Sequence, residues 1–590
     1  MPESPDAPTP LNNAQIAEIF EQLADLLEFQ NENPFRVRAY RNAARAIRDY
    51  PGSIAALARS DPRELEKIPG IGRHVAEKCA VIVETGRLPQ LEELKKQIPA
   101  SVLDLLRIPG MGPKKAAALY RELHIETLDD LKKACESHRV QKLKGFGAKT
   151  EEAILKALER SDLREHRILW AQADAIVQSL RGHLSSVAEI RQLEVAGSYR
   201  RGKETVGDLD LLVDAEDAAP AMDRLATFPG VAEVLARGST KMSVRLESNL
   251  QIDLRVVPTE SFGAALQYFT GSKAHNVHLR HLARQRKLKI NEYGVFDESG
   301  KKERRIAGET EASVYASLDL PCFPPEIREN RFEFAWAEDG ELPALVELED
   351  IRGDLHMHTT ETDGRNSLEE MCEAAIGRGL KYIAITDHSQ RVTMANGLTP
   401  QRLRRQWKAI DKLNEKYGRR LHVLKGVECD ILEKGGLDLP DDVLAEADWV
   451  VASVHYGQNQ SREQITERIL GALEHPAVCA IAHPTGRLLN RRPPYEVDLE
   501  AVLDAAARNH KLMELNANPY RLDLNDVYCQ AAREKGIPIV ISTDAHSTTG
   551  LDAMRYGVLQ ARRGGLTASD VANARPFSKF MQLVRRARKV

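Results

Sequence analysis

Apolar residues recur at helical spacing through most of the first 160 residues. In the first such segment the apolar positions fall three and four residues apart, which is the period that lines one face of an α-helix. The pattern predicts that residues 12–160 are almost entirely helical. The positions in this first segment are Ile16, Ile19, Phe20, Leu23, Leu26 and Leu27.

From about residue 190 the period changes to that of strands. After residue 351, short apolar runs that end in polar residues alternate with helical stretches, which predicts a parallel-stranded α/β domain. Function in such folds lies at the carboxyl ends of the strands. The predicted strands before residue 351 are Leu193–Ala196, Asp208–Val213, Met242–Leu246 and Ile252–Val257, and those after it are Tyr382–Asp387, Trp449–His455, Val478–His483, Leu512–Asn516 and Pro538–Asp544.

Composition narrows the class of protein. The chain has 590 residues, which at about 150 residues per domain predicts about four domains. Hydrophobic residues make up 42% of the chain, which excludes wholesale disorder. No apolar run reaches the ~18 residues of a membrane span, and residues 1–10 lack the apolar core of a signal peptide. The seven cysteines form no CxxC pair, which is typical of the reducing cytoplasm.

The formal net charge of −4 would, as a whole-chain sum, disfavour a nucleic-acid partner. Its distribution changes that interpretation. Residues 336–350 carry six acidic residues and no basic one, whereas residues 1–335 have a net charge of −1 and residues 351–590 one of +3. The acidic stretch separates two differently patterned halves, so it is predicted to be an interdomain linker; a solvated helix face near a boundary would have the same composition. With the stretch set aside, both halves are compatible with DNA.

Three segments repeat one pattern of two glycines, each between a preceding helix and an Ala-rich following helix: Ile68–Gly72, Ile108–Gly112 and Leu143–Gly147. Paired glycines let the backbone turn sharply, and the free N–H groups that begin the second helix can bind phosphate without reading sequence. One copy alone would indicate no more than a tight helical hairpin. Three copies resemble the helix-hairpin-helix motif of sequence-independent DNA-binding proteins. The predicted DNA contacts are Gly70, Gly72, Gly110, Gly112, Gly145 and Gly147, with added charge from Lys114, Lys115 and Lys149.

Asp208 and Asp210 lie two residues apart on a predicted strand, so their side chains point to the same side. A third acid, Asp253, lies on another apolar strand. Three converging carboxylates repel one another unless divalent cations neutralise them. Two Mg²⁺ ions held this way can activate a hydroxyl and stabilise a leaving pyrophosphate. Upstream, Ser198 and Arg201 would lie beside a triphosphate.

The segments GSYRR (197–201), GDLD (207–210), IDLR (252–255) and YFTGS (268–272) resemble the family X DNA polymerases, the group that contains DNA polymerase beta. The resemblance covers about residues 12–335. It implies a nucleotidyltransferase palm whose three aspartates hold two Mg²⁺ or Mn²⁺ ions, with Asp253 activating the primer 3′-hydroxyl.

The same resemblance implies positions that contact the substrates. Residues 261–291 support it independently, because they carry six Lys or Arg, three His and no acid, as expected beside bound DNA. The implied nucleotide contacts are Ser198, Arg201, Gly207, Tyr268, Phe269, Gly271 and Asn276, and the implied DNA contacts are Lys241 and Arg280.

Residues 33–41 and the first hairpin resemble the lyase domain of the same family. Lys78 falls at the family's Schiff-base lysine, which implies a catalytic role in lyase chemistry. Two neighbouring lysines of that pocket appear here as Arg36 and His74. A Schiff base needs an unprotonated amine, which neighbouring cations favour; a single helix lysine is otherwise a solvated side chain.

Nine residues with metal-ligating side chains lie at or near the carboxyl ends of the apolar runs after residue 351. A barrel of such strands would gather them at one mouth, although a core histidine is the alternative for any single one. Six imidazoles and three carboxylates exceed the needs of one tetrahedral ion and fit two or three Mn²⁺, Zn²⁺ or Fe ions bridged by a carboxylate. The nine are His356, His358, Asp363, His388, Glu428, His455, His483, Asp544 and His546.

The segments HMHTTETDG, TDHS, GVECD, SVH, AHPTG and STDAH resemble the PHP domain (polymerase and histidinol phosphatase family) over about residues 351–575. No ligand position is substituted, and the family implies metal-dependent phosphoester hydrolysis. It implies one site with His356, His358, Glu428 and Asp544, a second that shares Glu428 and adds His455 and His483, and a third with Asp363, His388 and His546.

A polymerase-like half joined to an intact PHP domain is the organisation of the bacterial family X polymerases. The sequence therefore predicts a cytoplasmic, nucleoid-associated bacterial monomer that fills gaps or nicks in double-stranded DNA from dNTPs during repair. It would also remove 3′ ends with a Mn²⁺-dependent 3′–5′ exonuclease, with cleavage at abasic sites as a further expected activity. Two interpretations remain beside it: a repair nuclease whose polymerase-like half is a DNA-binding platform, and a non-enzymatic protein that bridges DNA ends.

The predicted fold is multidomain. The domains are an N-terminal helical lyase-like DNA-binding domain (1–95), a helix-hairpin-helix fingers-type domain (96–165), an α/β nucleotidyltransferase palm (166–260), a thumb-like domain that contacts nucleotide and template (261–335), the acidic linker (336–350) and a PHP (β/α) barrel (351–590).

Overall fold

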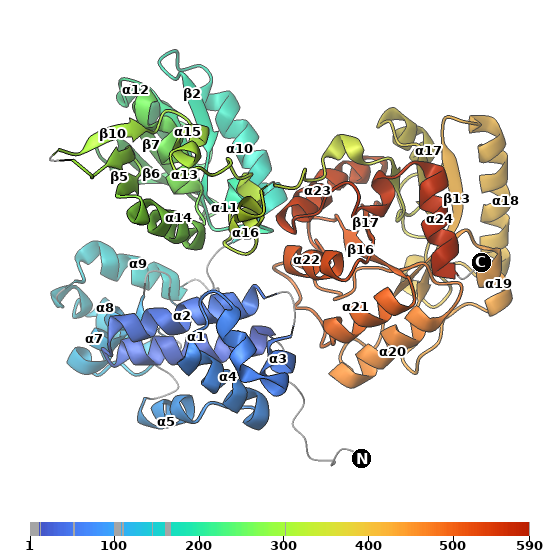
Figure 1. Cartoon of the computed structure of the whole chain (residues 1–590), viewed down its shortest axis with the longest axis horizontal. Coiled ribbons are helices and arrows are strands. Elements are labelled where there is room, and N and C mark those ends of the chain that lie inside the picture. The colour runs from blue at the N-terminus through green and yellow to red at the C-terminus, as the bar shows by residue number, and fades with distance from the viewer. Residues whose placement is uncertain are drawn as a thin grey trace. The chain divides into compact units, whose positions relative to one another are not determined.

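The computed structural model describes residues 11, 13–50, 53–98, 105, 108, 111–143, 145–159, 167–300, 302–340 and 342–588. Contacts within the chain divide it into two compact units, Met1–His166 and Arg167–Val590. Figure 1 shows the elements of both units. Among the described residues, no helix is long and apolar enough to cross a membrane.

The first unit contains only helices and turns over its described residues, as the apolar periodicity predicts. The apolar face of the first helix packs against the second, where the rings of Phe20 and Tyr40 stack with their centroids 6.0 Å apart. The same apolar core continues through the later helices. The helices are α1 (Asn13–Phe29), α2 (Pro34–Arg48), α3 (Ile54–Ser60), α4 (Arg73–Thr85), α5 (Pro89–Gln97), α7 (Pro113–Leu123), α8 (Leu128–Glu136) and α9 (Ala148–Glu159).

The described residues of the three Gly-x-Gly segments share one backbone hydrogen bond. In each one, the N–H that follows the first glycine donates to the carbonyl three residues earlier, at 3.0, 2.9 and 3.0 Å in chain order. Gly70 and Gly145 have φ of +97° and +91°, which glycine adopts without strain. Gly72 and Gly112 precede the first residues of α4 and α7. Gly110 and the side chain of Lys149 lie outside the described residues.

The second unit begins with a five-stranded sheet in the order β2-β4-β7-β6-β5, in which β4 and β7 are parallel and the other pairs antiparallel. Helices α10 and α12 share its apolar core on one side. The sequence pattern predicts four of these strands and misses β5, whose side chains are mostly exposed. The elements are α10 (Trp170–Leu184), β2 (Gln192–Val195), α11 (Gly197–Arg200), β4 (Asp208–Asp214), α12 (Ala219–Ala226), β5 (Val231–Arg237), β6 (Lys241–Leu246) and β7 (Gln251–Val257).

A helical layer with a small antiparallel sheet follows. Its centre holds a fully buried pair in which His275 Nδ1 lies 2.8 Å from Glu333 Oε1. The predicted linker 336–350 is not simply a connector, because Val346 is buried and its N–H donates to the carbonyl of Leu566 at 2.9 Å. The elements are α13 (Phe262–Thr270), α14 (Lys273–Gln285), β8 (Leu288–Asn291), β9 (Gly294–Asp297), β10 (Arg304–Ala307), α15 (Glu311–Ala316) and α16 (Glu333–Glu338).

The rest of the unit is a seven-stranded parallel barrel whose strands lie in chain order. The apolar runs give the positions of five of the strands. The strands before His356 and around Glu428 are expected without bounds, and the structure has them as β11 and β13. The strands are β11 (Gly353–Asp354), β12 (Tyr382–Ile385), β13 (His422–Asp430), β14 (Trp449–Ser453), β15 (Ala480–Ile481), β16 (Leu512–Asn516) and β17 (Ile539–Ser542), and the helices are α17 (Leu368–Gly377), α18 (Pro400–Tyr417), α19 (Asp441–Glu446), α20 (Arg462–Glu474), α21 (Leu499–Arg508), α22 (Asp526–Glu534), α23 (Met554–Arg563) and α24 (Phe577–Arg588).

The barrel closes between its first and last strands. Met357 and Ala545 form an isolated parallel bridge just beyond β11 and β17. The fully buried side chain of Asn573 donates to the carbonyls of Gly353 and Ile541, each at 2.7 Å, and accepts from the N–H of Ile541 at 3.0 Å. The side chain of Asn573 therefore replaces the backbone hydrogen bonds that would otherwise join β11 directly to β17.

The two ends of the barrel differ. The C-terminal helix α24 packs its apolar face against the amino ends of the strands, where Phe580 contacts Tyr382 and Trp449 with ring centroids 5.1 and 5.5 Å apart. The carboxyl ends of the strands form the opposite mouth. Metal-ligating side chains at these ends are therefore brought together, as the sequence predicts.

We expect Asn573→Ala to lower the free energy of unfolding by about 2–4 kcal/mol, because it leaves buried backbone groups of two strands without partners. Chemical denaturation of the full chain measures the change. Arg585→Ala, on the exposed side of α24, is the control and should change stability by less than about 0.5 kcal/mol. Equal stabilities of the two variants would contradict the closing role of Asn573.

Candidate active sites

The palm sheet brings the three predicted aspartates onto adjacent strands. Asp210 on β4 and Asp253 on β7 are directly paired in the parallel register, and Asp208 lies two residues before Asp210 on the same strand. Gly197 packs against this site, since a Cβ on it would lie 2.8 Å from Asp210 Oδ2. The β-strand spacing argued from the sequence therefore places all three on one patch.

A lysine partly neutralises this patch. Lys241, predicted to contact DNA, lies on β6 with its Nζ 2.8 Å from Asp253 Oδ2. Burial raises the pKa of Asp253, but hydrogen bonds from Lys241 and Ser243 outweigh it and lower the pKa overall. Burial, together with the nearby charges of Asp208 and Asp253, raises the pKa of Asp210 to about 6. Among the described residues, the groups whose ligand atoms lie close enough together to share one ion do not include these three aspartates.

The predicted triphosphate contacts meet around Arg201. Its Nη1 donates to the carbonyl of Thr270, next to Gly271, whose φ is +72°. Its Nε lies 3.1 Å from Glu329 Oε1. Ser198 lies in the short helix α11, which ends just before Arg201, and its carbonyl accepts from the N–H of Lys203 at 3.1 Å.

The other predicted nucleotide and template contacts lie along α13 and α14. Asn276 donates to the carbonyl of Tyr268 at 2.8 Å, and Arg280 donates to the carbonyl of Asn276 at 3.2 Å. Phe269 lies under the guanidinium of Arg255 at 4.4 Å. Gly207 lies against Arg167 instead, since a Cβ on it would approach Arg167 Nη1 to 2.9 Å.

In the first unit, the predicted lyase lysine is half-buried. Lys78 Nζ donates to Gln90 Oε1 at 2.9 Å and lies 6.0 Å from the ring centroid of Tyr40. The two substituted positions have other partners: His74 lies 3.4 Å from Glu77, and Arg36 lies 3.4 Å from Glu32. Lys114, which follows the second hairpin turn, is exposed.

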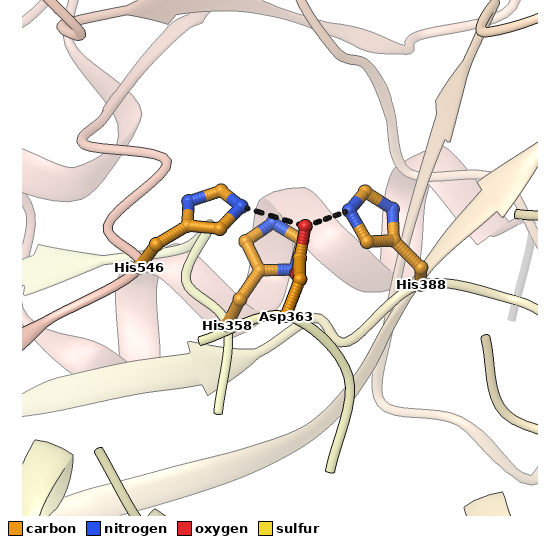
Figure 2. A group of neighbouring side chains, drawn as sticks. All are labelled: His358, Asp363, His388 and His546. Carbon is orange, nitrogen blue, oxygen red and sulfur yellow. Dashed lines mark ion pairs between the residues drawn. The ribbon is translucent and has the colours of Figure 1, made fainter. Parts of the chain in front are cut away.

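The barrel mouth brings all nine predicted ligands together. Figure 2 shows the most open group, in which the imidazoles of His388 and His546 point toward the carboxylate of Asp363 beside His358. His388 Nε2 and His546 Nε2 lie 3.5 and 3.3 Å from Asp363 Oδ2. His358 Nδ1 lies 3.8 Å from the other oxygen. This is the predicted third group, with His358 added.

Glu428 lies at the centre of the other ligands and is 1% exposed. Its Oε1 lies 3.0 Å from His483 Nε2 and 3.4 Å from His455 Nε2. Its Oε2 lies 3.4 Å from His356 Nε2 and 3.7 Å from His358 Nε2. One carboxylate thus faces two groups of imidazoles, which is the geometry of a bridging ligand.

Asp544 completes the inner group. Its Oδ1 lies 3.2 Å from His358 Nε2 and 3.6 Å from His356 Nε2. His388 also approaches Glu428, with Nδ1 2.8 Å from Oε2. The predicted groups are therefore contiguous and share His358, His388 and Glu428.

The donor set fits a metal cluster. Several fully buried ring and carboxylate atoms at the mouth have no hydrogen-bond partner, although buried polar atoms normally have one. Nitrogen and carboxylate donors in this mixture suit Mn²⁺, Zn²⁺ or Fe. The clear cases are His358 Nδ1 and His483 Nδ1. His356 Nε2, His358 Nε2, His388 Nδ1 and Glu428 Oε2 also make no hydrogen bond of good geometry, although each lies within 3.4 Å of an atom of opposite charge.

The ligand histidines differ in protonation. Burial, together with the charges of His388 and His546, lowers the pKa of His358 to about 3. Burial and nearby Arg521 lower the pKa of His483 to about 3. Both imidazoles are therefore neutral near pH 7, with a lone pair free for a metal.

Burial lowers the pKa of His388, but the charges of Glu428 and Asp363 outweigh it and raise the pKa to about 10, and nearby carboxylates raise the pKa of His356 and His546 in the same way. A cation that took the place of these protons would meet the same carboxylates.

Sequence reasoning missed the residues that orient these ligands. Glu514 Oε1 lies 2.7 Å from His356 Nδ1, and its Oε2 accepts from the N–H of His483 at 2.7 Å. Asp430 Oδ1 lies 3.2 Å from His455 Nδ1. Both acids lie at the carboxyl ends of strands, so the rule that found the ligands could have found them too. Such partners fix the ring orientation and tautomer of a ligating histidine.

We expect Asp210→Asn to stabilise the metal-free protein at pH 7.5 by about 2 kcal/mol. Because the folded-state pKa of Asp210 is raised to about 6, the wild-type protein loses stability as pH rises from about 4 through about 6, where the buried group must ionise. At pH 4 the difference should nearly vanish. Thermal unfolding in a chelator measures it, with exposed Asp223→Asn as the control. A stabilisation that is equal at both pH values would rule out this origin.

We expect Glu514→Gln to weaken metal binding at the barrel mouth by about 10- to 100-fold, because His356 loses the carboxylate that orients it. Calorimetric titration of the metal-free protein with Mn²⁺ measures the affinity. Exposed Glu496→Gln in the same domain is the matched control. An unchanged affinity for Glu514→Gln would show that Glu514 has no orienting role.

Family models match consecutive parts of the chain. The descriptions are a helix-hairpin-helix domain at residues 11–88, a SAM-like helix-hairpin-helix tandem at 102–160, a DNA polymerase beta palm at 167–268, a DNA polymerase beta thumb at 265–329 and a PHP domain at 354–518. These matches confirm the predicted multidomain fold. Helix-hairpin-helix and polymerase thumb domains imply that the chain binds DNA.

Curated relatives match the whole chain or one half of it. DNA polymerase lambda of Rattus norvegicus is 26% identical over 54% of this chain and 56% of its own length. A probable phosphatase of Thermoanaerobacter sp. (strain X514) is 29% identical over 37% of this chain and 89% of its own. The DNA polymerase/3′-5′ exonuclease PolX of Bacillus subtilis (strain 168) is 41% identical over 98% of this chain and 100% of its own. The chain therefore belongs to the PolX family, in which a polymerase beta-like core is joined to a PHP domain.

Proposed function

We propose that this chain is a DNA-directed DNA polymerase that also removes nucleotides from DNA 3′ ends with the metal cluster of its PHP barrel. The observation that supports the proposal is the presence of two separate sets of ligand-type side chains. One lies on the palm sheet and the other at the barrel mouth. The similarity to the polymerase and exonuclease of B. subtilis supports the same pair of activities.

In the polymerase half, Asp208, Asp210 and Asp253 would hold two Mg²⁺ or Mn²⁺ ions. These ions would stabilise charge on the attacking and leaving oxygens. Arg201 and Ser198 would bind the triphosphate of a dNTP. For Asp253 to take part, Lys241 must release it, which leaves the Lys241 ammonium free to meet a DNA phosphate.

In the PHP half, the nine ligands would hold two or three Mn²⁺, Zn²⁺ or Fe ions, which activate water for phosphoester hydrolysis. The groups nearest solvent are Asp363 and His546, with side chains 35% and 37% exposed. A DNA 3′ end would therefore reach the cluster from their side. Deeper ligands such as Glu428 would hold the ions in place.

The preferred substrate in this proposal is gapped or nicked double-stranded DNA, bound without regard to sequence by the glycine turns of the first unit. The protein would act as a monomer in the bacterial cytoplasm, where its seven free cysteines remain reduced. Gap filling after removal of damaged 3′ ends would make it a repair enzyme. Cleavage at abasic sites belongs to the same PHP chemistry.

We expect Asp208→Ala to lower nucleotide incorporation by about a hundredfold or more while 3′-end removal continues. His358→Ala should do the reverse, because each residue lies in only one of the two ligand sets. Time courses on DNA with a one-nucleotide gap, with and without dNTPs, measure both activities in Mg²⁺ or Mn²⁺. Thermal unfolding controls for folding.

If either substitution abolished both activities in folded protein, the division into two sites would be wrong. If wild-type protein removed 3′ ends but never extended the gap, the polymerase half would be a DNA-binding platform for the nuclease. If neither activity appeared with any metal, a non-enzymatic role in bridging DNA ends would remain.

A further inference from the structure

The loop that follows α11 and carries Arg201, one of the proposed triphosphate contacts, packs against the PHP barrel, within the second unit. Gly202 on this loop has φ +67°, and a Cβ on it would lie 2.6 Å from Leu559 on α23. Two residues later, Glu204 Oε2 lies 2.7 Å from Arg487 Nη2 of the barrel. No side chain fits at position 202, so the loop and α23 are in direct contact.

Arg563, the last residue of α23, makes the most buried contact with this loop and is 1% exposed. Its Nη1 donates to the carbonyl of Arg201 and lies 3.1 Å from Glu329 Oε1. Glu329 Oε1 is the oxygen that Arg201 Nε contacts at 3.1 Å. Arg563 thus contacts both the backbone of Arg201 and the partner of its side chain.

Positively charged side chains outnumber carboxylates around Arg563. Glu329 also accepts Lys203 Nζ at 3.3 Å. Arg563 Nη2 lies 2.7 Å from Asp526, which in turn accepts Arg331 Nη2 at 3.0 Å. Four cations therefore share two carboxylates, and the excess positive charge lies on the side of Arg201 and Lys203. A cluster with this excess of positive charge is suited to binding a polyanion.

We propose that Arg563 of the PHP domain is a positioning residue for nucleotide binding in the polymerase domain. Arg563 would hold the backbone of Arg201 in place. When the triphosphate takes the place of the Glu329 carboxylate at the Arg201 guanidinium, Arg563 would keep its own contact with Glu329. The barrel would then contribute to dNTP affinity without taking part in nucleotidyl transfer. This inference rests on the proposed polymerase function.

The adjacent residue supplies a matched control. Arg562 also crosses to the polymerase half, with Nε 2.9 Å from Glu326 and Nη1 2.6 Å from Glu347. It contacts neither Glu329 nor Arg201 among the interactions of the described residues. Arg562→Ala therefore removes contacts between the two domains but keeps the contacts proposed to position the triphosphate loop.

Steady-state gap filling by the full chain tests the proposal. We expect Arg563→Ala to raise KM for dNTP by about tenfold with kcat changed by less than about threefold. Arg563→Lys, which keeps the charge but not the forked donors, should give an intermediate KM. Arg562→Ala should leave KM unchanged, and 3′-end removal should persist in every variant.

An equal rise in KM for Arg562→Ala and Arg563→Ala would overturn the proposal, because domain contact in general would then be responsible. An unchanged KM for Arg563→Ala in active protein would overturn it as well. If Arg563→Ala does not fold, Asp526→Asn, which removes the second partner of Arg563, should raise KM in the same direction, and no change would refute the proposal. Wild-type protein that incorporates no nucleotide would instead refute the proposed polymerase function.

Discussion

The buried carboxylate of Glu428 is the interaction on which the barrel mouth depends. It lies at the carboxyl end of β13 and faces imidazoles from four other strand ends. A carboxylate buried this deeply is stable only where positive charge or hydrogen-bond donors surround it. Parallel strands in a closed barrel bring such donors from distant parts of the sequence to one point. The closing contacts of Asn573 and the packing of α24 at the opposite end hold the strands in the arrangement that this requires.

The palm stabilises its carboxylates differently from the barrel mouth. Its aspartates lie on an open sheet, Asp208 is exposed, and Lys241 already pairs with Asp253. Asp253 is buried and Asp210 half-buried, and Lys241 compensates part of their charge. The raised pKa of Asp210 shows that the compensation is incomplete.

The sequence locates most strand ends, and the candidate ligand residues that lie at them, because both follow a local period. Asp208 and Asp210 two apart, and His356 and His358 after a strand, need only the alternation of side chains. Edge strand β5 escapes the pattern because its side chains are exposed on both faces, and β13 receives no clear bounds because Lys425 and Gly426 interrupt its apolar run. The strand-end rule could have flagged Glu514, but its pairing with His356, like that of Lys241 with Asp253, has no local signal. These pairings follow only from strand order and register.

Contacts between distant segments also decide which charges are paired within the fold, and for this reason the net charge of −4 is a poor guide to DNA binding. Many acidic residues of this chain do not face solvent. Glu428 and Asp544 lie among imidazoles, and Glu329 and Asp526 are paired with arginines where the polymerase half meets the barrel. A charge that is neutralised within the fold exerts little field at the surface, because the paired ions screen each other over a few ångströms. The field at the surface that DNA would contact is therefore set by the charged residues outside these pairs. A sum over the sequence cannot separate the paired charges from the unpaired ones.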